Sequence, residues 1–372
     1  MRTNLQIAWS ADSVEERRQQ LQGERSGRSY SRIADPWRDA LVQQLCAFQG
    51  AANGVAVTSG MAAVNFAFSA LVPYNTSDRR PLVLYAQNTF YECARRIQHL
   101  SRRMGFDCLA VTTTDVDLLR SQLVDITDRD RLCMLWMEAI ANPSLEVADI
   151  SAIADVLKRV SPFALLVVDN TALPCLQQSL TLGADVEVFS LSKYHSQGYV
   201  HGGAVLANDP ELICLLHADL PDFGISLGVQ DVVSLLGRLP SLGDRVVQHC
   251  QNAKQLALLL QAHPAIARVS YPTITSANQD LTARQMQGFG GGLVSFELAG
   301  GKVAGDRLMY SIEKRSGTIS ITPTFGASTT HIEHYRTFMA DGYPSGFCRM
   351  AVGLEPVANV WGILQSLLDS LI

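Results

Sequence analysis

The sequence lacks the features of several protein classes. It has no apolar run near the roughly 18 residues that a membrane helix needs, so a membrane-spanning protein is not expected. It has no block of basic residues, and its net charge of −5 argues against nucleic acid or an anionic membrane as a partner. Its first 22 residues carry acids and arginines without an apolar core, so a signal peptide is not expected.

Cysteine pairs and metal-ligand clusters are also missing from the sequence. The 8 cysteines include no CxxC pair and lie mostly in apolar stretches, which indicates reduced thiols and a cytoplasmic protein. His331 and His334 have the spacing of metal ligands, but no cysteines or acids cluster with them, so no metal site is expected. The chain is nevertheless long and apolar: 372 residues, 47% of them hydrophobic, are enough for two domains and a sizeable core.

Strand-like and helical patterns alternate through the first two thirds of the chain. Short apolar runs typical of buried strands occur at 54–58, 81–85, 107–111, 132–137, 164–169, 185–190 and 203–206. Helical patterns occur at 36–49, 60–71, 91–104, 116–123, 150–160 and 177–182. This alternation predicts an α/β fold with a mostly parallel sheet that is covered by helices on both faces.

The pattern changes near residue 235. A long amphipathic helix is expected at 245–262, a turn into a strand at 288–296, another strand at 349–352 and a closing helix at 357–371. These elements predict a second, smaller α+β domain. We therefore divide the chain into an N-terminal segment (1–54), a large domain (55–235) and a C-terminal small domain (236–372).

A lysine and an aspartate stand at the ends of two strand-like runs. Lys193 follows one run together with Ser190 and Ser192, and Asp169 ends another. Pyridoxal 5′-phosphate (PLP) needs a lysine that binds its aldehyde as a Schiff base, an acid that keeps its ring nitrogen protonated, and donors for its phosphate. Because ligands of such sheets bind at the carboxyl ends of strands, these residues indicate a PLP site. Taken singly, they would more often be a solvated surface lysine and a helix cap.

The segment 58–63 predicts part of a phosphate site. A strand ends there, a Ser59-Gly60 turn follows, and a helix begins. The first turn of a helix presents unpaired N–H groups and the positive end of its dipole, and glycine lets an anion approach the backbone. A serine helix cap with no ligand has the same pattern, so the prediction depends on the lysine and the aspartate downstream.

Together, these motifs resemble the Cys/Met-metabolism PLP-dependent enzymes, also called the trans-sulfuration or cystathionine γ-synthase-like family. The resemblance runs from about residue 30 to the C-terminus. It is carried by the stretches 30–32, 58–63, 138–143, 167–185, 190–194, 288–298 and 349–355. It implies PLP-dependent fold type I (aspartate aminotransferase-like), with a mostly parallel sheet in the large domain and a smaller α+β C-terminal domain.

The resemblance also implies roles for residues around the cofactor ring. Lys193 would hold the cofactor and move protons, and Asp169 would pair with the ring nitrogen. Tyr91 would stack on the ring and help proton transfer, and Asn142, accompanied by Glu138, would lie near the ring hydroxyl. A further residue, Arg349, would bind the substrate carboxylate, which a guanidinium can hold with two hydrogen bonds.

The phosphate site implied by the resemblance involves two subunits. The residues of one chain that would bind the phosphate are Gly60, Met61, Ser190 and Ser192. Tyr30 and Arg32 would reach the same phosphate from a neighbouring subunit. The protein would then be a homo-oligomer, at least a dimer, with active sites shared between subunits. A tetramer is expected from the resemblance, but the short N-terminal arm before Tyr30 leaves dimer and tetramer open.

The chain departs from the family pattern on the substrate side. Glu92 and Cys93 interrupt a Tyr-Gly-Gly-Thr run; the cysteine is similar to that of methionine γ-lyases, and Glu92 would place a carboxylate near the site. The loop 194–203 lacks the usual Asn-Gly-His. The stretch 316–323 lacks the glutamate that would bind the distal amino group of cystathionine, and either Ser320 or Thr322 could replace the family's serine beside Lys193.

These features predict a carbon–sulfur or carbon–heteroatom lyase that eliminates a substituent from Cγ of an L-amino acid, which is a small-molecule and specialised substrate, similar to methionine γ-lyase and cystathionine γ-lyase. The alternative is a γ-replacement transferase, similar to cystathionine γ-synthase or O-acylhomoserine sulfhydrylase. A binding protein that has kept only the fold is disfavoured, because Lys193, Asp169, Tyr91 and Arg349 are all present. A nicotinamide enzyme is disfavoured, because no GxGxxG follows the first strand.

Overall fold

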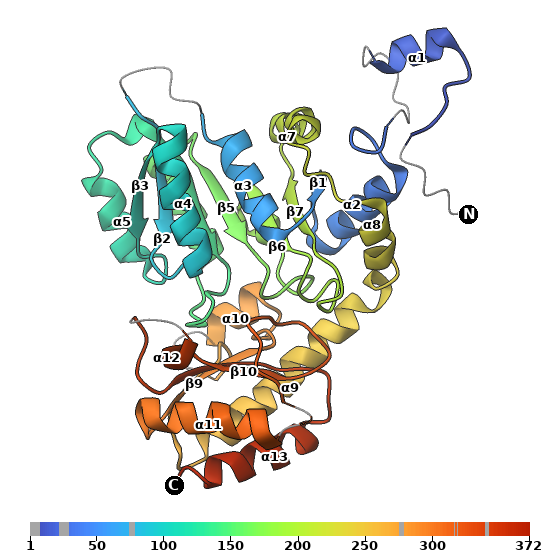
Figure 1. The fold of residues 1–372 in the computed structure, drawn as a ribbon. Helices are drawn as coiled ribbons and strands as arrows, with labels where there is room; N and C mark the ends of the chain where they lie inside the picture. Colours follow the sequence, from blue (N-terminus) through green and yellow to red (C-terminus); the bar gives the residue numbers. More distant parts are fainter. Residues whose placement is uncertain are drawn as a thin grey trace.

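A computed structural model describes residues 8–21, 30–73, 79–274, 279–315, 317, 319–338 and 342–372. Figure 1 shows a large sheet with its helices above a smaller sheet with its own helices, and the long helix α9 (Leu242–Gln261) running between the two. Helix α1 (Val14–Leu21) stands away from both layers (Figure 1). Among the described residues, no helix is both long and apolar enough to cross a membrane.

The large sheet has seven strands in the order β1-β7-β6-β5-β4-β2-β3. The strands are β1 (Asn53–Val57), β2 (Leu82–Ala86), β3 (Asp107–Val111), β4 (Leu132–Glu138), β5 (Leu165–Asp169), β6 (Val186–Ser190) and β7 (Gly203–Ala207). The run from β3 to β6 is parallel throughout, and only β7 is antiparallel to its neighbours β1 and β6. The predicted mostly parallel sheet is therefore confirmed.

Helices cover both faces of the large sheet. One face is covered by α3 (Gly60–Leu71), α4 (Tyr91–Met104) and α7 (Pro210–Phe223). The other is covered by α2 (Pro36–Gln49), α5 (Val116–Asp125), α6 (Ile150–Val160) and α8 (Val229–Leu236). Strand β2 shows the reason: Leu84 joins one core and its neighbours Val83 and Tyr85 join the other, because successive side chains of a strand point to opposite faces.

The small sheet has four antiparallel strands in the order β10-β11-β9-β8. They are β8 (Ile266–Ser270), β9 (Leu293–Leu298), β10 (His331–His334) and β11 (Phe347–Ala351). Their core is closed by α9, α11 (Gly301–Arg315) and α13 (Val357–Asp369), and the short helix α12 (Tyr335–Phe338) follows β10. This is the smaller α+β layer that the sequence predicted. Helix α10 (Gln279–Gln285) packs against the core of the large sheet instead.

The sequence predictions agree closely with the large sheet and less closely with the rest. Each expected strand of the large sheet is present, with its ends shifted by at most one residue. The helix expected at 177–182 is wrong: only a short 3₁₀ turn, Ser179–Leu182, forms there. The side chain of Asn170 donates a hydrogen bond to the backbone carbonyl of Gln177 at 2.8 Å, so this carbonyl is bonded outside any helix. Gly183, at φ 103°, ends the 3₁₀ turn. The division of the chain at residues 54 and 235 stays a prediction.

Candidate active site

The candidate active site lies where the carboxyl ends of β4, β5 and β6 face the small-sheet layer. Glu138 ends β4 and Asp169 ends β5, and the two are paired in register across the sheet. Lys193 follows β6, and its Nζ donates to Oγ1 of Thr324, in the segment before β10, at 3.2 Å. Residues from distant parts of the chain therefore meet at the edge where parallel sheets place their ligands.

Lys193 is held in a largely buried position. Besides Thr324, its Nζ lies 5.0 Å from the centre of the Phe325 ring. The backbone of Gly326 packs so closely on this loop that a Cβ there would lie 2.5 Å from the backbone nitrogen of Tyr194. Burial lowers the pKa of the Lys193 amine to about 8, and the positive charge of Arg349 acts in the same direction. A substantial fraction of the amine is therefore neutral near pH 7 to 8 and able to act as a nucleophile or a base.

The hydroxyl beside Lys193 belongs to neither of the two residues that the sequence suggested. Ser320 Oγ lies 2.5 Å from Nδ1 of His331, and Ser320 pairs with that residue across a β-bridge. Thr322 Oγ1 is buried and has no hydrogen-bond partner among the described residues. The hydroxyl of Thr324 contacts the lysine instead, which corrects the expectation. The segment around Thr324 is neither helix nor strand, so the spacing of residues in the sequence does not show which hydroxyl faces inward.

Two buried carboxylates lie side by side at the floor of the site. Asp169 accepts the backbone N–H of Thr171 at 2.9 Å, and burial raises the pKa of its carboxyl above the usual value. Glu138 accepts the N–H groups of Phe90 at 2.6 Å and of Asn142 at 2.9 Å. Burial, followed by the charge of Asp169, raises the pKa of Glu138 to about 8. A protonated Glu138 leaves Asp169 as the acid that can carry a negative charge beside a cationic ring.

The N-terminus of α3 forms a cradle with Ser190. Ser59 caps the helix by accepting the N–H of Ala62 at 3.0 Å, so the N–H groups of Gly60 and Met61 lie ahead of any acceptor within the helix. A Cβ on Gly60 would lie 2.7 Å from Cβ of Ser190, so only glycine fits there. These donors and the Ser190 hydroxyl suit an anion such as phosphate. The hydroxyl of Ser192, in contrast, accepts the N–H of Gly202 at 3.1 Å and stabilises the loop between β6 and β7.

Arg349 of β11 is almost fully buried and contacts side chains from two other parts of the chain. Its Nη1 donates to Oδ1 of Asn142 at 3.1 Å, and its Nη2 donates to Oε2 of Glu333 at 2.6 Å. Its Nε is buried and has no hydrogen-bond partner among the described residues. Glu333 stands opposite Arg349 in the β10–β11 register. The guanidinium is therefore oriented by two contacts and keeps one donor for a ligand.

Tyr91 and Glu92 begin α4 at the mouth of the site. The Tyr91 ring is 40% exposed, and its hydroxyl donates to Glu92 at 3.3 Å. Burial, with a further contribution from the charge of Glu92, raises the pKa of the Tyr91 phenol, so the phenol keeps its proton at neutral pH. Cys93, in contrast, is buried in the core beneath α4, and burial raises the pKa of its thiol well above the usual value. Cys93 is therefore core packing rather than a surface of the site.

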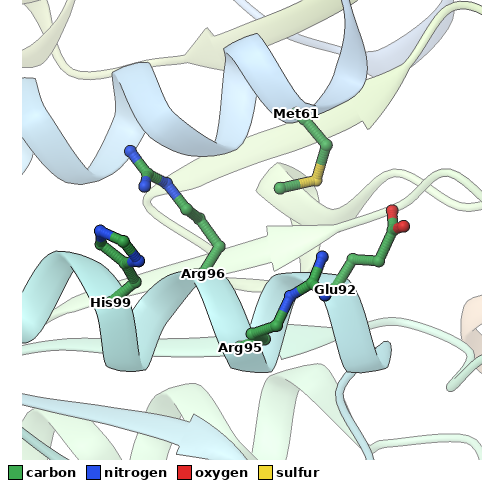
Figure 2. Close-up of a pocket in the computed structure, with 5 residues that line it drawn as sticks. All are labelled: Met61, Glu92, Arg95, Arg96 and His99. Atoms are coloured by element: carbon green, nitrogen blue, oxygen red, sulfur yellow. The ribbon is translucent and has the colours of Figure 1, made fainter.

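A pocket of about 480 Å³ lies between the starts of α3 and α4. Figure 2 shows the side chains that line it: Met61 of α3, and Glu92, Arg95, Arg96 and His99 of α4. Arg96 donates to the side chain of Asn65, which in turn donates to the carbonyl of Met61 at 2.7 Å. The pocket therefore places basic side chains beside the start of α3.

Tyr30 and Arg32 lie near the end of α7 in their own chain. Arg32 donates to the carbonyl of Pro221 at 2.7 Å and accepts from Ser226 at 2.8 Å through its backbone carbonyl. The Arg32 guanidinium also lies 5.6 Å from the centre of the Tyr30 ring. These contacts do not involve the cradle of the same chain, and the role of both residues in a neighbouring subunit stays a prediction.

The sequence prediction missed Thr324, Glu333 and Thr171. Thr171 accepts the N–H of Ser190 at 2.9 Å and so joins the ends of β5 and β6. Its place directly after the Asp169-Asn170 pair could have indicated this role. Glu333 could have been found only if the short run 331–334 had been recognised as a strand beside 349–352. The histidines at both ends of this run obscure the alternation of apolar and polar residues that is typical of a strand.

Known proteins were then compared with this chain. The sequence profile of the Cys/Met metabolism PLP-dependent enzymes matches residues 6–368. The chain belongs to this family. It is 30% identical to an L-methionine gamma-lyase of Fusobacterium nucleatum subsp. polymorphum over 97% of the chain and 91% of that protein. It is 33% identical to a cystathionine gamma-synthase of Mycobacterium tuberculosis (strain H37Rv) over 93% of the chain and 87% of that protein.

A solved structure shares both the fold and the cofactor of this family. The putative O-acetylhomoserine (thiol)-lyase of Campylobacter jejuni subsp. jejuni carries N′-pyridoxyl-lysine-5′-monophosphate. It is 25% identical to this chain, with a TM-score of 0.87 over 98% of this chain and 94% of that one. The chain is thus a PLP-dependent enzyme of the trans-sulfuration family, whose substrates are amino acids. Its residues suit PLP, because they provide a buried amine, a buried acid and a cradle that any Cβ would fill.

Proposed function

We propose that this enzyme eliminates a substituent from Cγ of an L-amino acid and releases a 2-oxo acid and ammonia. The observation that carries the proposal is the buried Arg349, whose Nε has no partner in the part of the chain that the structure describes, together with Lys193, whose pKa is lowered to about 8 by burial and by the charge of Arg349. The arginine suits an α-carboxylate, and the lysine suits proton removal from the neighbouring Cα.

Each residue of the candidate site has one role in the proposed reaction. Arg349 binds the carboxylate and fixes the substrate near Lys193. The neutral amine of Lys193 removes a proton from Cα. It would pass this proton on to the bound cofactor and, neutral again, would remove a second proton from Cβ. Thr324 orients this amine through their hydrogen bond. Tyr91 keeps its phenolic proton at neutral pH and gives it to the departing Cγ substituent. When bound, PLP supplies a conjugated ring that stores the electrons released at Cα, and Asp169 holds the proton on the ring nitrogen.

The choice between elimination and γ-replacement depends on the stretch 316–323. The glutamate that would bind the distal amino group of cystathionine is absent there, which favours a lyase with a specialised substrate. Cys93 adds no support, because it is buried in the core. The similarity to a cystathionine γ-synthase keeps γ-replacement as the second candidate.

A panel of γ-substituted amino acids tests the proposal. Thioether, acyl ester and halide derivatives are assayed for 2-oxo acid and ammonia, with and without an added thiol, and Lys193→Ala serves as the inactive control. We expect 2-oxo acid and ammonia from at least one derivative without a thiol. Product that forms only with thiol, as a new thioether, would establish γ-replacement and refute the lyase.

We also propose that active sites are shared between two copies of the chain through Tyr30 and Arg32. Lys193→Ala and Arg32→Ala chains should each be inactive or weakly active alone. Co-refolded mixtures should regain activity, because one of the two sites in a mixed dimer contains an intact Lys193 and an intact Arg32. A mixture no more active than its two components would disprove the shared site.

A further inference from the structure

Glu333 is a buried carboxylate in the site to which the proposed reaction assigns no role. Its Oε2 lies 2.6 Å from Nη2 of Arg349, and the two side chains are only 11% and 3% exposed. The two residues stand opposite each other in the β10–β11 register, which places their side chains on the same face of the sheet. The substrate-binding arginine is thus already partly neutralised before a substrate arrives.

The free donor of Arg349 shows where a substrate carboxylate would bind. Nη1 is used by Asn142, whereas Nε is buried without a partner among the described residues. A carboxylate that binds a guanidinium side-on uses Nε together with Nη2, since these two nitrogens share one edge of the planar group. The incoming carboxylate would therefore share Nη2 with Glu333.

Two carboxylates on one buried nitrogen repel each other. A single guanidinium balances only one negative charge, and in buried sites a close carboxylate pair holds one shared proton. The groups that face Glu333 come from four elements: Arg349 on β11, Lys193 after β6, Tyr91 on α4 and Tyr335 on α12. Arg349 and Lys193 favour the ionised form of Glu333, but burial outweighs them and raises the pKa of Glu333 above its usual value. Both tyrosines have raised pKa values and stay neutral, so they add no charge of either sign beside Glu333.

We propose that Glu333 couples binding of the substrate carboxylate at Arg349 to the uptake of one proton by Glu333. This inference rests on the proposed function, because it takes Arg349 as the carboxylate site. The proton comes from solvent and forms an O–H bond on Glu333, so the full charge of Arg349 becomes available to the substrate. Carboxylate affinity then falls about tenfold for each pH unit above the pKa of Glu333, since each unit lowers the protonated fraction tenfold.

The test uses butanoate, a carboxylate without an amine, on the PLP-loaded enzyme. Calorimetric titrations between about pH 6 and 9, each in two buffers of different ionisation enthalpy, give both the dissociation constant and the number of protons taken up. Wild type should take up close to one proton per butanoate at the alkaline end, with a dissociation constant that rises with pH. Glu333→Gln should take up none, show a flat pH profile and bind more tightly than wild type at alkaline pH.

A matched control is Glu297→Gln, which alters a carboxylate on the neighbouring strand β9 and should behave like wild type. The proposal is overturned if wild type binds butanoate without proton uptake, or binds none at any pH. It is also overturned if Glu333→Gln keeps the wild-type slope or binds more weakly at every pH, which would make Glu333 only a support for Arg349. Butanoate cannot undergo elimination, so a failure of the amino-acid panel would leave this result intact, and the two proposals fail separately.

Discussion

The two sheets bury a carboxylate in opposite ways. Glu187 of β6 is fully buried, and its Oε1 accepts from the neutral side chains of Asn170 at 2.6 Å and Ser179 at 3.2 Å. Burial raises the pKa of Glu187 to about 8, so the folded protein holds it largely protonated at neutral pH. Glu333 of β10 is paired instead with the guanidinium of Arg349, which opposes the effect of burial on its pKa.

The two halves of the candidate site, one on the large sheet and one on the small sheet, are therefore stabilised by different interactions. The large-sheet half, with Lys193 and Asp169, obtains its geometry from strand ends and a helix N-terminus. The small-sheet half depends on the buried guanidinium of Arg349, which we propose as the binding site of the substrate carboxylate. Changes in the first half should therefore affect chemistry and pH behaviour, whereas changes in the second should affect folding and binding together.

The largest expected effect is on the chemistry of the large-sheet half. Lys193→Ala removes the amine that we propose binds the cofactor and moves protons, so kcat should fall by at least about 10³-fold. Stability in urea should change little, because the variant removes a partly desolvated amine rather than a buried ion pair. Lys254→Ala, at an exposed position of α9, is the control. Borohydride labelling and peptide mass spectrometry should locate the cofactor on Lys193 in wild type; a label on another lysine would break the assignment.

In the small-sheet half, a substitution should change the stability of the fold strongly. Arg349→Ala leaves Glu333 buried without its cation, which should lower the free energy of unfolding by about 3–5 kcal/mol. Replacing both residues by apolar ones of similar volume, Arg349→Met with Glu333→Leu, should recover most of this loss. Lys302→Ala breaks an exposed pair with Asp306 and should cost less than about 1 kcal/mol. Urea unfolding measures all three, and equal losses for the exposed and the buried pair would remove the distinction drawn between the two halves.

Sequence reasoning could reach the large-sheet half because its determinants are local. Short apolar runs predict the strands, and a polar residue stands at or just after the end of several of them. Because the strands are parallel, these polar residues meet at one edge of the sheet. Lys193, Asp169 and Gly60 were predicted as site residues in this way, and their roles stay predictions. Glu333 and Thr324 could not be predicted in this way. The position of Glu333 depends on the antiparallel register of β10 with β11, and Thr324 lies in a segment that is neither helix nor strand.

The pH dependence of stability should distinguish Glu187 from the paired acid. A carboxyl whose pKa is about 8 when folded and 4.5 when unfolded keeps its proton only in the folded state between these values. Its contribution is fully present below pH 4.5 and is lost as pH rises toward 8, with a slope of up to about 1.4 kcal/mol per pH unit. Glu187→Gln, which keeps the neutral donors satisfied, should flatten this slope and raise stability at pH 8. An unchanged slope in urea titrations across this range would show that Glu187 is ionised in the folded protein.

The smallest expected effect concerns the cradle. Gly60→Ala places a Cβ 2.7 Å from Cβ of Ser190, so one of the two must shift, and such overpacking costs about 1–3 kcal/mol. Because Ser190 belongs to the same cradle, the apparent dissociation constant of PLP should rise about tenfold or more, which corresponds to about 1.4 kcal/mol. Gly362→Ala is the matched change on α13, where an added Cβ meets nothing within 4 Å, and it should stabilise the helix by about 0.5–1 kcal/mol. Cofactor titration followed by absorbance, together with thermal unfolding of the apoprotein, separates a loss of cofactor affinity from a general loss of stability. If both alanines leave PLP affinity unchanged, the close approach of α3 to Ser190 serves helix packing alone, and the large-sheet half would hold its cofactor mainly through Lys193 and Asp169.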